Sequence, residues 1–394
     1  MAISKLAGSI KESMTLAITA KAKKLKQEGK SIIGFTAGEP DFDSPEIVKK
    51  ACEQALKEGF TKYTPASGMP ELKTAICKKL ERENGLIYQP NQIVVSSGAK
   101  SSLYHAILAI VDPGDEVIIP TPFWLTYEEQ VKLAEGKCVF VNTSETGYKL
   151  TEELFRQNIT EKTKAVIINS PSNPTGAVYT KEELAVIAKV CVEKDIYIIS
   201  DEIYEKLVYG VEHVSIASVS EEAKNKTIII NGMSKAYSMT GWRIGYTASS
   251  VEIAKAMTNV QSHTTSNACS LSQYASVVAL NEADQFTQDA KSIFSARRLL
   301  MVEFAKKLKN VSFVEPQGAF YLFIDVSKYY GKSFNGKVIN GSIDMADALL
   351  DMGVAVIPGL PFGDDNCIRL SYAVSETDIV KGFERIESFL QQVK

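Results

Sequence analysis

Short apolar runs rich in β-branched residues alternate with longer amphipathic stretches through the middle of the chain. Brief runs of Val, Ile and Thr are typical of buried strands, whereas helices place apolar residues every three or four positions. The pattern predicts helices at residues 101–110 and 181–194 and strands at residues 93–97, 116–119, 138–142, 165–169, 196–200, 227–231 and 244–248. Because strands separated by helices favour βαβ units, we expect an α/β fold with a mostly parallel central sheet covered by helices on both faces.

The two ends of the chain follow a different pattern. Residues 1–44 contain one amphipathic helix and a turn rich in Gly and Pro, FTAGEPDFDSP. From about Gln285 the pattern predicts a long helix, then short strands at 318–325, 354–358 and 367–372 and a closing helix at 376–392. We therefore predict a large domain at residues 45–284 and a smaller α/β domain built from both termini, residues 1–44 and 285–394.

Composition narrows the class of protein. A chain of 394 residues suits two domains, and a net charge of −3 argues against nucleic acid or an anionic membrane as the main partner. No apolar run approaches the roughly 20 residues of a membrane span, and Lys and Glu interrupt any signal-like segment near the start. The six cysteines are scattered without ligand spacing, which favours reduced thiols and no metal site. We expect a cytoplasmic protein.

Polar and aromatic residues follow the predicted strands at their carboxyl ends. In open parallel sheets, ligands bind beyond those ends. Five of six consecutive strands lead into such groups: Gly98, Ala99 and Lys100; Trp124; Asn173; Asp201 and Tyr204; Ser234 and Lys235. We expect these side chains to form one site.

The segment NGMSKAYSMTGWRIGY, residues 231–246, contains two cations that need an explanation. Lys235 follows a predicted strand and Arg243 stands among apolar neighbours, and lone buried cations are costly. A single anionic cofactor would account for both, with an aldehyde condensing with Lys235 and a phosphate held by Ser234 and Arg243. The backbone N–H groups of Ala99 and Lys100, at a predicted helix start, would add donors for the phosphate.

Six motifs occur in order along the chain: AGEPDF, KYTPASG, PSNPTG, SDEIYE, SKAYSMTGWRIGY and IRLSYA. With them the sequence resembles the class I aminotransferases of fold type I, nearest to the bacterial-type aspartate aminotransferases of the gamma subgroup. The resemblance implies pyridoxal 5'-phosphate as the cofactor, bound as a Schiff base to Lys235. It also implies that Asp201 pairs with the pyridine nitrogen, that Tyr204 and Asn173 contact the phenolic oxygen, and that Trp124 stacks on the ring.

The resemblance further implies how substrates bind. Arg369, in IRLSYA, and the backbone of Gly38 would bind the α-carboxylate, with Trp124 and Asn173 beside it. Lys100, Ser13 and Thr15 would recognise a second carboxylate, which favours transamination between aspartate and 2-oxoglutarate by a ping-pong mechanism. The family forms homodimers with shared active sites, so Tyr63 would reach the phosphate of the partner subunit's cofactor.

Other interpretations remain open at this point. Asp201 could cap a helix, Trp124 could belong to the core, and Arg369 could form a structural ion pair. Related enzymes act on alanine, aromatic amino acids, kynurenine or prephenate, and some are C–S β-lyases. Two other classes are disfavoured. A ligand-sensing domain of a transcription regulator would need a helix-turn-helix domain, for which we expect no room in the short segment ahead of AGEPDF, and no G-x-G-x-x-G follows a predicted strand, as a nicotinamide dehydrogenase would need.

Overall fold

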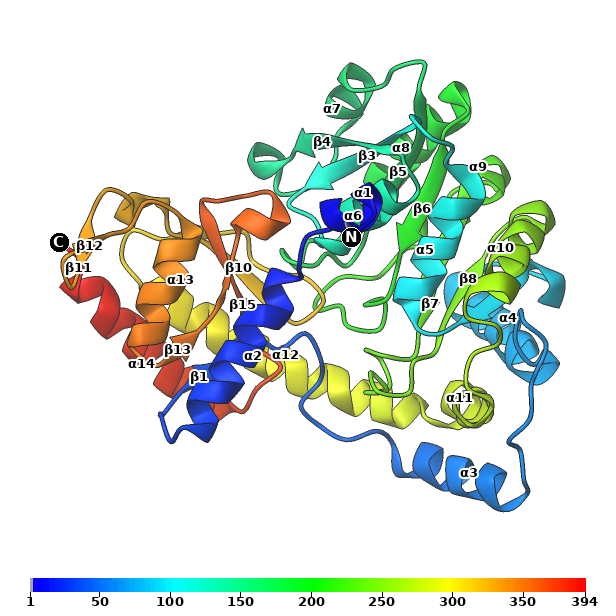
Figure 1. Ribbon diagram of the computed structural model, residues 1–394, viewed down its shortest axis with the longest axis horizontal. Coiled ribbons are helices and arrows are strands. Elements are labelled where there is room, and N and C mark those ends of the chain that lie inside the picture. Colours follow the sequence, from blue (N-terminus) through cyan, green and yellow to red (C-terminus); the bar gives the residue numbers. More distant parts are fainter. Residues whose placement is uncertain (1–2) are drawn as a thin grey trace.

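A seven-stranded sheet forms the centre of the larger part of the protein, in a computed structural model that describes residues 3–394 (Figure 1). The strands stand in the order β2 (Ile93–Ser96), β8 (Gly245–Ala248), β7 (Thr227–Gly232), β6 (Tyr197–Asp201), β5 (Thr163–Asn169), β3 (Glu116–Thr121) and β4 (Lys137–Asn142). β8 runs antiparallel to both of its neighbours, and every other pair is parallel. The prediction of a mostly parallel sheet is therefore confirmed.

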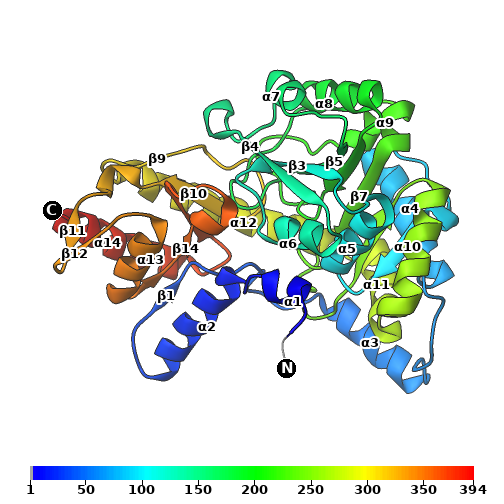
Figure 2. The ribbon, with the colours of Figure 1, turned by 45° about the horizontal axis from the view of Figure 1, so that its top comes forward.

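Helices cover both faces of this sheet (Figure 2). The residues of its central strands are therefore buried whichever face they point to. One face packs against α5 (Ala99–Ile110), α6 (Thr126–Leu133) and α10 (Val251–Thr264). The other face packs against α7 (Glu152–Gln157), α8 (Lys181–Lys194), α9 (Glu221–Lys226), α4 (Pro70–Asn84) and α11 (Ser270–Glu282), with α3 (Glu46–Lys57) against α11.

The smaller part contains an antiparallel four-stranded sheet in the order β14 (Ile357–Pro358), β15 (Cys367–Ser371), β10 (Tyr321–Asp325) and β9 (Ser312–Phe313). A short pair is formed by β11 (Ser333–Phe334) and β12 (Lys337–Val338). Its helices are α13 (Ser342–Asp351) and α14 (Glu376–Gln392), and the 24-residue α12 (Asp284–Lys307) runs into it from the larger part (Figure 1).

The two ends of the chain meet in this smaller part. β1 (Ile33–Gly34) pairs in parallel with β13 (Val354–Ala355), and the N-terminal helices α1 (Lys5–Ser9) and α2 (Met14–Gln27) precede it. Phe35, directly after β1, is fully buried and packs against Phe383 of α14. The fold thus joins both termini in one smaller α/β unit, as the sequence predicts.

Some predicted elements differ from the structure. The described part of the N-terminal segment, residues 3–44, holds two helices where one is predicted, because Ser4 caps a separate short helix, α1. The strand predicted at 354–358 divides into β13 and β14, which belong to different sheets. The strand predicted at 318–325 begins only at Tyr321, since Gly318 packs against Pro171 and bridges to Val208. Over the described range, no helix has the length and apolar character needed to cross a bilayer.

Candidate functional site

A cavity of about 480 Å³ lies at the carboxyl edge of the central sheet, where side chains of the smaller part also reach it. Its lining includes the predicted residues Thr15, Gly38, Ala99, Lys100, Trp124, Asn173, Asp201, Tyr204, Ser234, Lys235, Arg243 and Arg369. Residues from distant segments are therefore brought together at one place. A second cavity, of about 550 Å³, lies against the segment Lys11–Met14 and Leu360–Gly363, and its lining contains no predicted site residue.

Lys235 stands on the turn that follows β7, and its side chain is partly buried in the cavity. Its Nζ donates a hydrogen bond of 2.5 Å to the backbone oxygen of Gly38, from the loop after β1. Burial lowers the pKa of Lys235 to about 8, and the nearby guanidinium groups of Arg243 and Arg369 act in the same direction. A neutral amine, the form that attacks a carbonyl carbon, is thus accessible near neutral pH.

Asp201 is the last residue of β6 and is 3% exposed. Its Oδ2 accepts a hydrogen bond of 2.7 Å from the hydroxyl of Tyr127, and its Oδ1 accepts one of 3.2 Å from the backbone N–H of Ile203. Burial raises the pKa of Asp201 to about 6, although both hydrogen bonds favour the ionised form. The carboxylate is therefore ionised at neutral pH inside a cavity where a ligand cation could pair with it.

Arg369 projects from β15 and is 3% exposed. Its Nη1 donates to Oδ1 of Asn173 at 3.0 Å and its Nη2 donates to the backbone oxygen of Thr36 at 3.1 Å, whereas its buried Nε has no partner among the described residues. The guanidinium stacks on the ring of Tyr321, with its Cζ 4.3 Å from the ring centre. It forms no ion pair with a described carboxylate, so a buried cation remains that an anionic ligand could neutralise.

Tyr204 lines the cavity and contacts Tyr321, the residue on which Arg369 stacks. Its hydroxyl lies 2.9 Å from the hydroxyl of Tyr321, and both side chains are buried. The two phenols can therefore relay a hydrogen bond between the end of β6 and the region of Arg369.

Close backbone contacts shape the end of the cavity at the start of α5. A Cβ at Gly245 would collide with the backbone nitrogen of Ala99, and a Cβ at Gly98, where φ is +85°, would collide with the guanidinium of Arg243. Ser234 contributes its side chain to the same lining. The first N–H groups of α5 and the Arg243 guanidinium thus lie close enough together to bind one anion.

Arg243 differs from its sequence-based description. It is exposed and adopts a left-handed conformation, φ +56°, just before β8, which begins only at Gly245. Its Nη1 donates to the backbone oxygen of Thr240 at 2.8 Å. The expectation that Arg243 is buried among its apolar neighbours was therefore wrong, because the turn before β8 leaves the side chain exposed where it lines the cavity.

Lys100 and Trp124 lie together in the lining of the cavity. The Nζ of Lys100 lies 4.9 Å from the centre of the Trp124 ring, and partial burial lowers the pKa of Lys100, as does the nearby Arg243. Thr15 lines the cavity and its hydroxyl lies 3.0 Å from that of Ser13, which is not part of the lining. Lys100 and the hydroxyl-bearing Thr15 therefore line the same cavity as Arg369.

Tyr63 lies apart from these residues. It is 92% exposed and does not line the cavity of its own chain.

A family model described as aminotransferase class I and II matches residues 30–386. The chain belongs to this family. An aspartate aminotransferase of Bacillus sp. strain YM-2 is 50% identical over 382 residues, 96% of each chain.

Two further similarities extend this result. A probable aspartate/prephenate aminotransferase of Aquifex aeolicus is 47% identical over 389 residues, 98% of this chain and 97% of the relative. The solved aspartate aminotransferase of Thermus thermophilus with maleate matches with a TM-score of 0.94 at 42% identity, covering 99% of this chain and 100% of that chain. The fold of this aminotransferase is therefore that of known aspartate aminotransferases.

The sequence did not reveal several residues that shape this aminotransferase site. Tyr127 holds Asp201, and Asn169 donates its Nδ2 to the Asp201 backbone oxygen at 3.0 Å. Tyr321 stacks on Arg369. Tyr127 lies three residues after Trp124, a spacing that places two aromatic side chains near each other at a helix start, whereas Tyr321 gives no local signal.

Proposed function

We propose that this protein transfers the amino group of aspartate to 2-oxoglutarate, with pyridoxal 5'-phosphate as its cofactor. One observation carries the proposal: Lys235, Asp201 and Arg369, which come from three distant segments, line one cavity. The Bacillus relative's name, aspartate aminotransferase, supports the same reaction.

The donor set of the cavity fits pyridoxal phosphate. The Lys235 amine suits an aldehyde, the buried Asp201 carboxylate suits a pyridinium, and Ser234, Arg243 and the first N–H groups of α5 suit a phosphate. Because Gly98 and Gly245 have no Cβ, a phosphate group could approach the backbone closely at this end of the cavity. When bound, the cofactor withdraws electrons from the substrate Cα.

The residues of this chain would then perform distinct tasks. Asp201 would pair with the ring nitrogen of the cofactor and keep it positive, and Tyr204 and Asn173 would orient the cofactor's phenolic oxygen. The neutral amine of Lys235 would carry a proton from the substrate Cα. Arg369 and Gly38 fix the α-carboxylate, so that the bond to be broken is aligned with the ring.

The preference for a dicarboxylic substrate rests on two of the four cationic residues that line the cavity, Arg369 and Lys100. Arg369 is buried and its Nε has no partner among the described residues, and the Nζ of Lys100 lies 4.9 Å from the centre of the Trp124 ring. We infer that Lys100, with Thr15 and Ser13, binds the distal carboxylate. The Thermus enzyme was solved with maleate, a dicarboxylate, which supports this assignment.

We further propose that the protein works as a homodimer. Tyr63 is 92% exposed although it belongs to the motif KYTPASG, which fits a side chain that completes the partner subunit's site. The division of the chain at residues 44–45 and 284–285 is part of the same proposal. A cytoplasmic location stays a prediction.

The decisive experiment is a spectral titration of the purified protein with single amino acids. Aspartate should convert the bound cofactor from its aldehyde to its amine form, and borohydride reduction followed by peptide mass spectrometry should place the adduct on Lys235. The acceptor assay should include prephenate, since the Aquifex relative's name contains it. An adduct on another lysine, or no adduct, would refute the proposal.

A further inference from the structure

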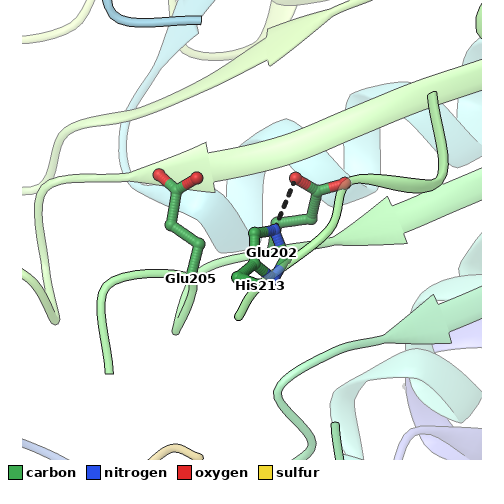
Figure 3. Close-up of side chains that lie close together, drawn as sticks. All are labelled: Glu202, Glu205 and His213. Atoms are coloured by element: carbon green, nitrogen blue, oxygen red, sulfur yellow. Dashed lines mark hydrogen bonds and ion pairs between the residues drawn. The ribbon is translucent and has the colours of Figure 1, made fainter. Parts of the chain in front are cut away.

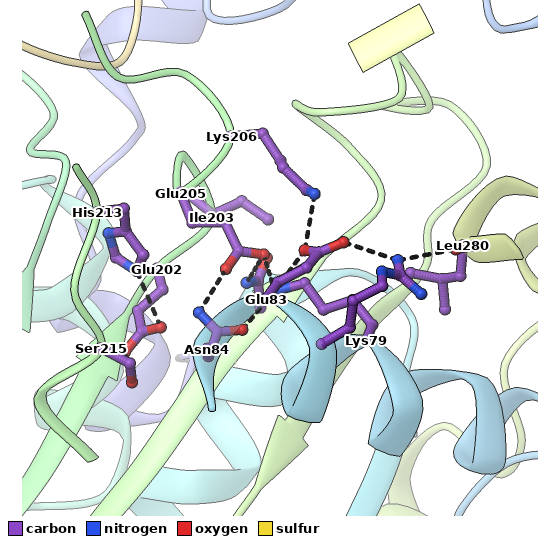
Figure 4. A network of polar contacts seen from close by, with 12 residues as sticks. Lys79, Glu83, Asn84, Glu202, Ile203, Glu205, Lys206, His213, Ser215 and Leu280 are labelled. Carbon is purple, nitrogen blue, oxygen red and sulfur yellow. Dashed lines mark hydrogen bonds and ion pairs between the residues drawn. The ribbon is translucent and has the colours of Figure 1, made fainter. Parts of the chain in front are cut away.

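A buried group of charged side chains connects two segments that carry the candidate site (Figure 4). Glu205 directly follows Tyr204, and Asn231 lies in β7 four positions before Lys235. The Nδ2 of Asn231 donates a hydrogen bond of 2.8 Å to Oε1 of Glu205. Asn231 is 2% exposed and Glu205 is 9% exposed, so this contact is shielded from solvent.

Glu205 is kept ionised by a lysine from α4. Lys79, 2% exposed, forms an ion pair with Oε1 of Glu205, and Asn84 donates to Oε2 at 3.2 Å. Burial raises the pKa of Glu205, but the Lys79 ammonium outweighs that effect and lowers it to about 2. The acceptor for Asn231 is therefore a carboxylate at every pH at which the protein would work.

Both ends of this contact are held in place. The Oδ1 of Asn231 accepts from the backbone N–H of Gly232 at 2.7 Å, so its Nδ2 must point at Glu205. The backbone N–H of Glu205 donates to the oxygen of Glu202 at 2.9 Å. Glu202 is itself fixed by the hydroxyls of Ser200 and Ser215, at 2.8 and 2.7 Å.

A metal ion is an alternative use for this cluster. Ligand atoms of Glu202, Glu205 and His213 lie within 4.8 Å of one another (Figure 3). However, the Lys79 ammonium already neutralises Glu205, and Nε2 of His213 contacts Glu202 at 3.2 Å. These partners satisfy the carboxylates without a metal ion, so the cluster is better explained as a structural connection.

We propose that Glu205 is a positioning residue that acts through Asn231. It fixes the turn carrying Ser234 and Lys235 relative to Asp201, at the end of β6, and Tyr204, in the turn that follows. The inference rests on the proposed function, because it concerns the spacing of the two groups that would hold the cofactor. The ion pair with Lys79 holds the Glu205 carboxylate in place. The hydrogen bond from Asn231 to this carboxylate then fixes the end of β7.

The test replaces Asn231 by aspartate, which keeps the acceptor for Gly232 and removes the donor to Glu205. The control is Lys149→Met, which breaks the contact of Lys149 with both oxygens of Glu183, away from β7. Amide hydrogen exchange is measured in the cofactor-free protein for residues 232–236, beside the unfolding midpoint. We expect exchange to be about tenfold faster there in Asn231→Asp and unchanged in Lys149→Met.

The second readout is the bound cofactor. In Asn231→Asp the dissociation constant for pyridoxal phosphate should rise about tenfold, and the pH midpoint of its absorbance change should move. A variant that loses stability but keeps wild-type exchange at 232–236 and a wild-type midpoint would overturn the proposal. If Asn231→Asp does not fold, Asn231→Ser applies the same test without adding charge. Exchange is read without cofactor, so a wild-type protein that fails to bind pyridoxal phosphate would refute the proposed function alone.

Discussion

The hydroxyl of Tyr127 donates a 2.7 Å hydrogen bond to Oδ2 of Asp201, from the first turn of α6 to the end of β6. This bond favours the ionised carboxylate against a burial that raises the pKa of Asp201 to about 6. Tyr127 is itself buried, and burial raises the pKa of its phenol, so it remains a donor across the working range.

Tyr127→Phe should therefore raise the pKa of Asp201 further. A hydrogen bond to a charged group contributes about 1.5–3 kcal/mol, which corresponds to roughly one to two pKa units. In the cofactor-free protein, the midpoint of the Asp201 titration, followed by NMR of the labelled carboxyl carbon, should move upward by about that amount. An unchanged midpoint would mean that the Tyr127 hydroxyl does not stabilise the ionised carboxylate.

Lys235→Ala should bind pyridoxal phosphate without covalent attachment and lose turnover. Removing both the nucleophile and the proton-transfer group should lower kcat by at least about 10²- to 10⁴-fold. Reduction with borohydride should leave no adduct in this variant. Turnover close to that of the wild type would contradict the role given to Lys235.

Lys100→Ser tests the dicarboxylate preference. Loss of a charge-assisted contact of about 1.5–3 kcal/mol should lower kcat/KM for aspartate by roughly 10- to 150-fold. Alanine, which has no second carboxylate, provides the internal control and should be affected little. Equal losses for both substrates would assign Lys100 to cofactor binding, where its position over Trp124 also places it.

In the cofactor-free protein, the burial of Lys235 should lower the free energy of unfolding at neutral pH. The pKa of Lys235 falls from 10.5 to about 8 on folding, so the folded state disfavours the ammonium at every pH below about 8. As pH rises from about 8 to about 10.5 the folded amine releases its proton first, and this cost disappears.

Lys235→Met should thus be more stable than the wild type at pH 7, by up to about 3 kcal/mol. The difference should shrink by pH 10. Urea unfolding of both cofactor-free proteins at the two pH values measures it. A difference that is constant with pH would show that the Lys235 pKa is not depressed.

Gly245→Ala should disrupt the anion-binding end of the cavity. The added methyl group meets the backbone nitrogen of Ala99, which cannot move away without displacing the start of α5. We expect a loss of about 1–3 kcal/mol in stability and weaker binding of pyridoxal phosphate. Gly241→Ala has open space around its Cβ and serves as the matched control.

Local sequence patterns predicted the strands well where burial on two faces demands β-branched residues. The β-branched run at residues 227–231 corresponds to β7, and the helical pattern at residues 181–194 corresponds to α8. In both cases the residues within the segment are enough to predict the element. Val354–Pro358 reads as one strand locally, but its two halves pair with β1 and β15, a division that only tertiary structure determines.

The site residues also divide into those that local sequence predicts and those that only the tertiary structure reveals. Asp201 and Lys235 could be predicted because both follow strands that end at one edge of the sheet. Tyr321 and Asn231 could not, since their importance comes from partners more than twenty residues away, Arg369 and Glu205. The exposure of Arg243 depends on one left-handed residue, which no composition rule specifies.

The reversed direction of β8 has a further consequence. Because β8 runs back along β7, the chain between them makes a single excursion over one edge of the sheet and carries both the amine of Lys235 and the guanidinium of Arg243. The two contacts that we propose for the cofactor, a covalent bond to Lys235 and an ion pair with Arg243, would thereby come from one short loop. An insertion or deletion in that loop would displace both side chains together.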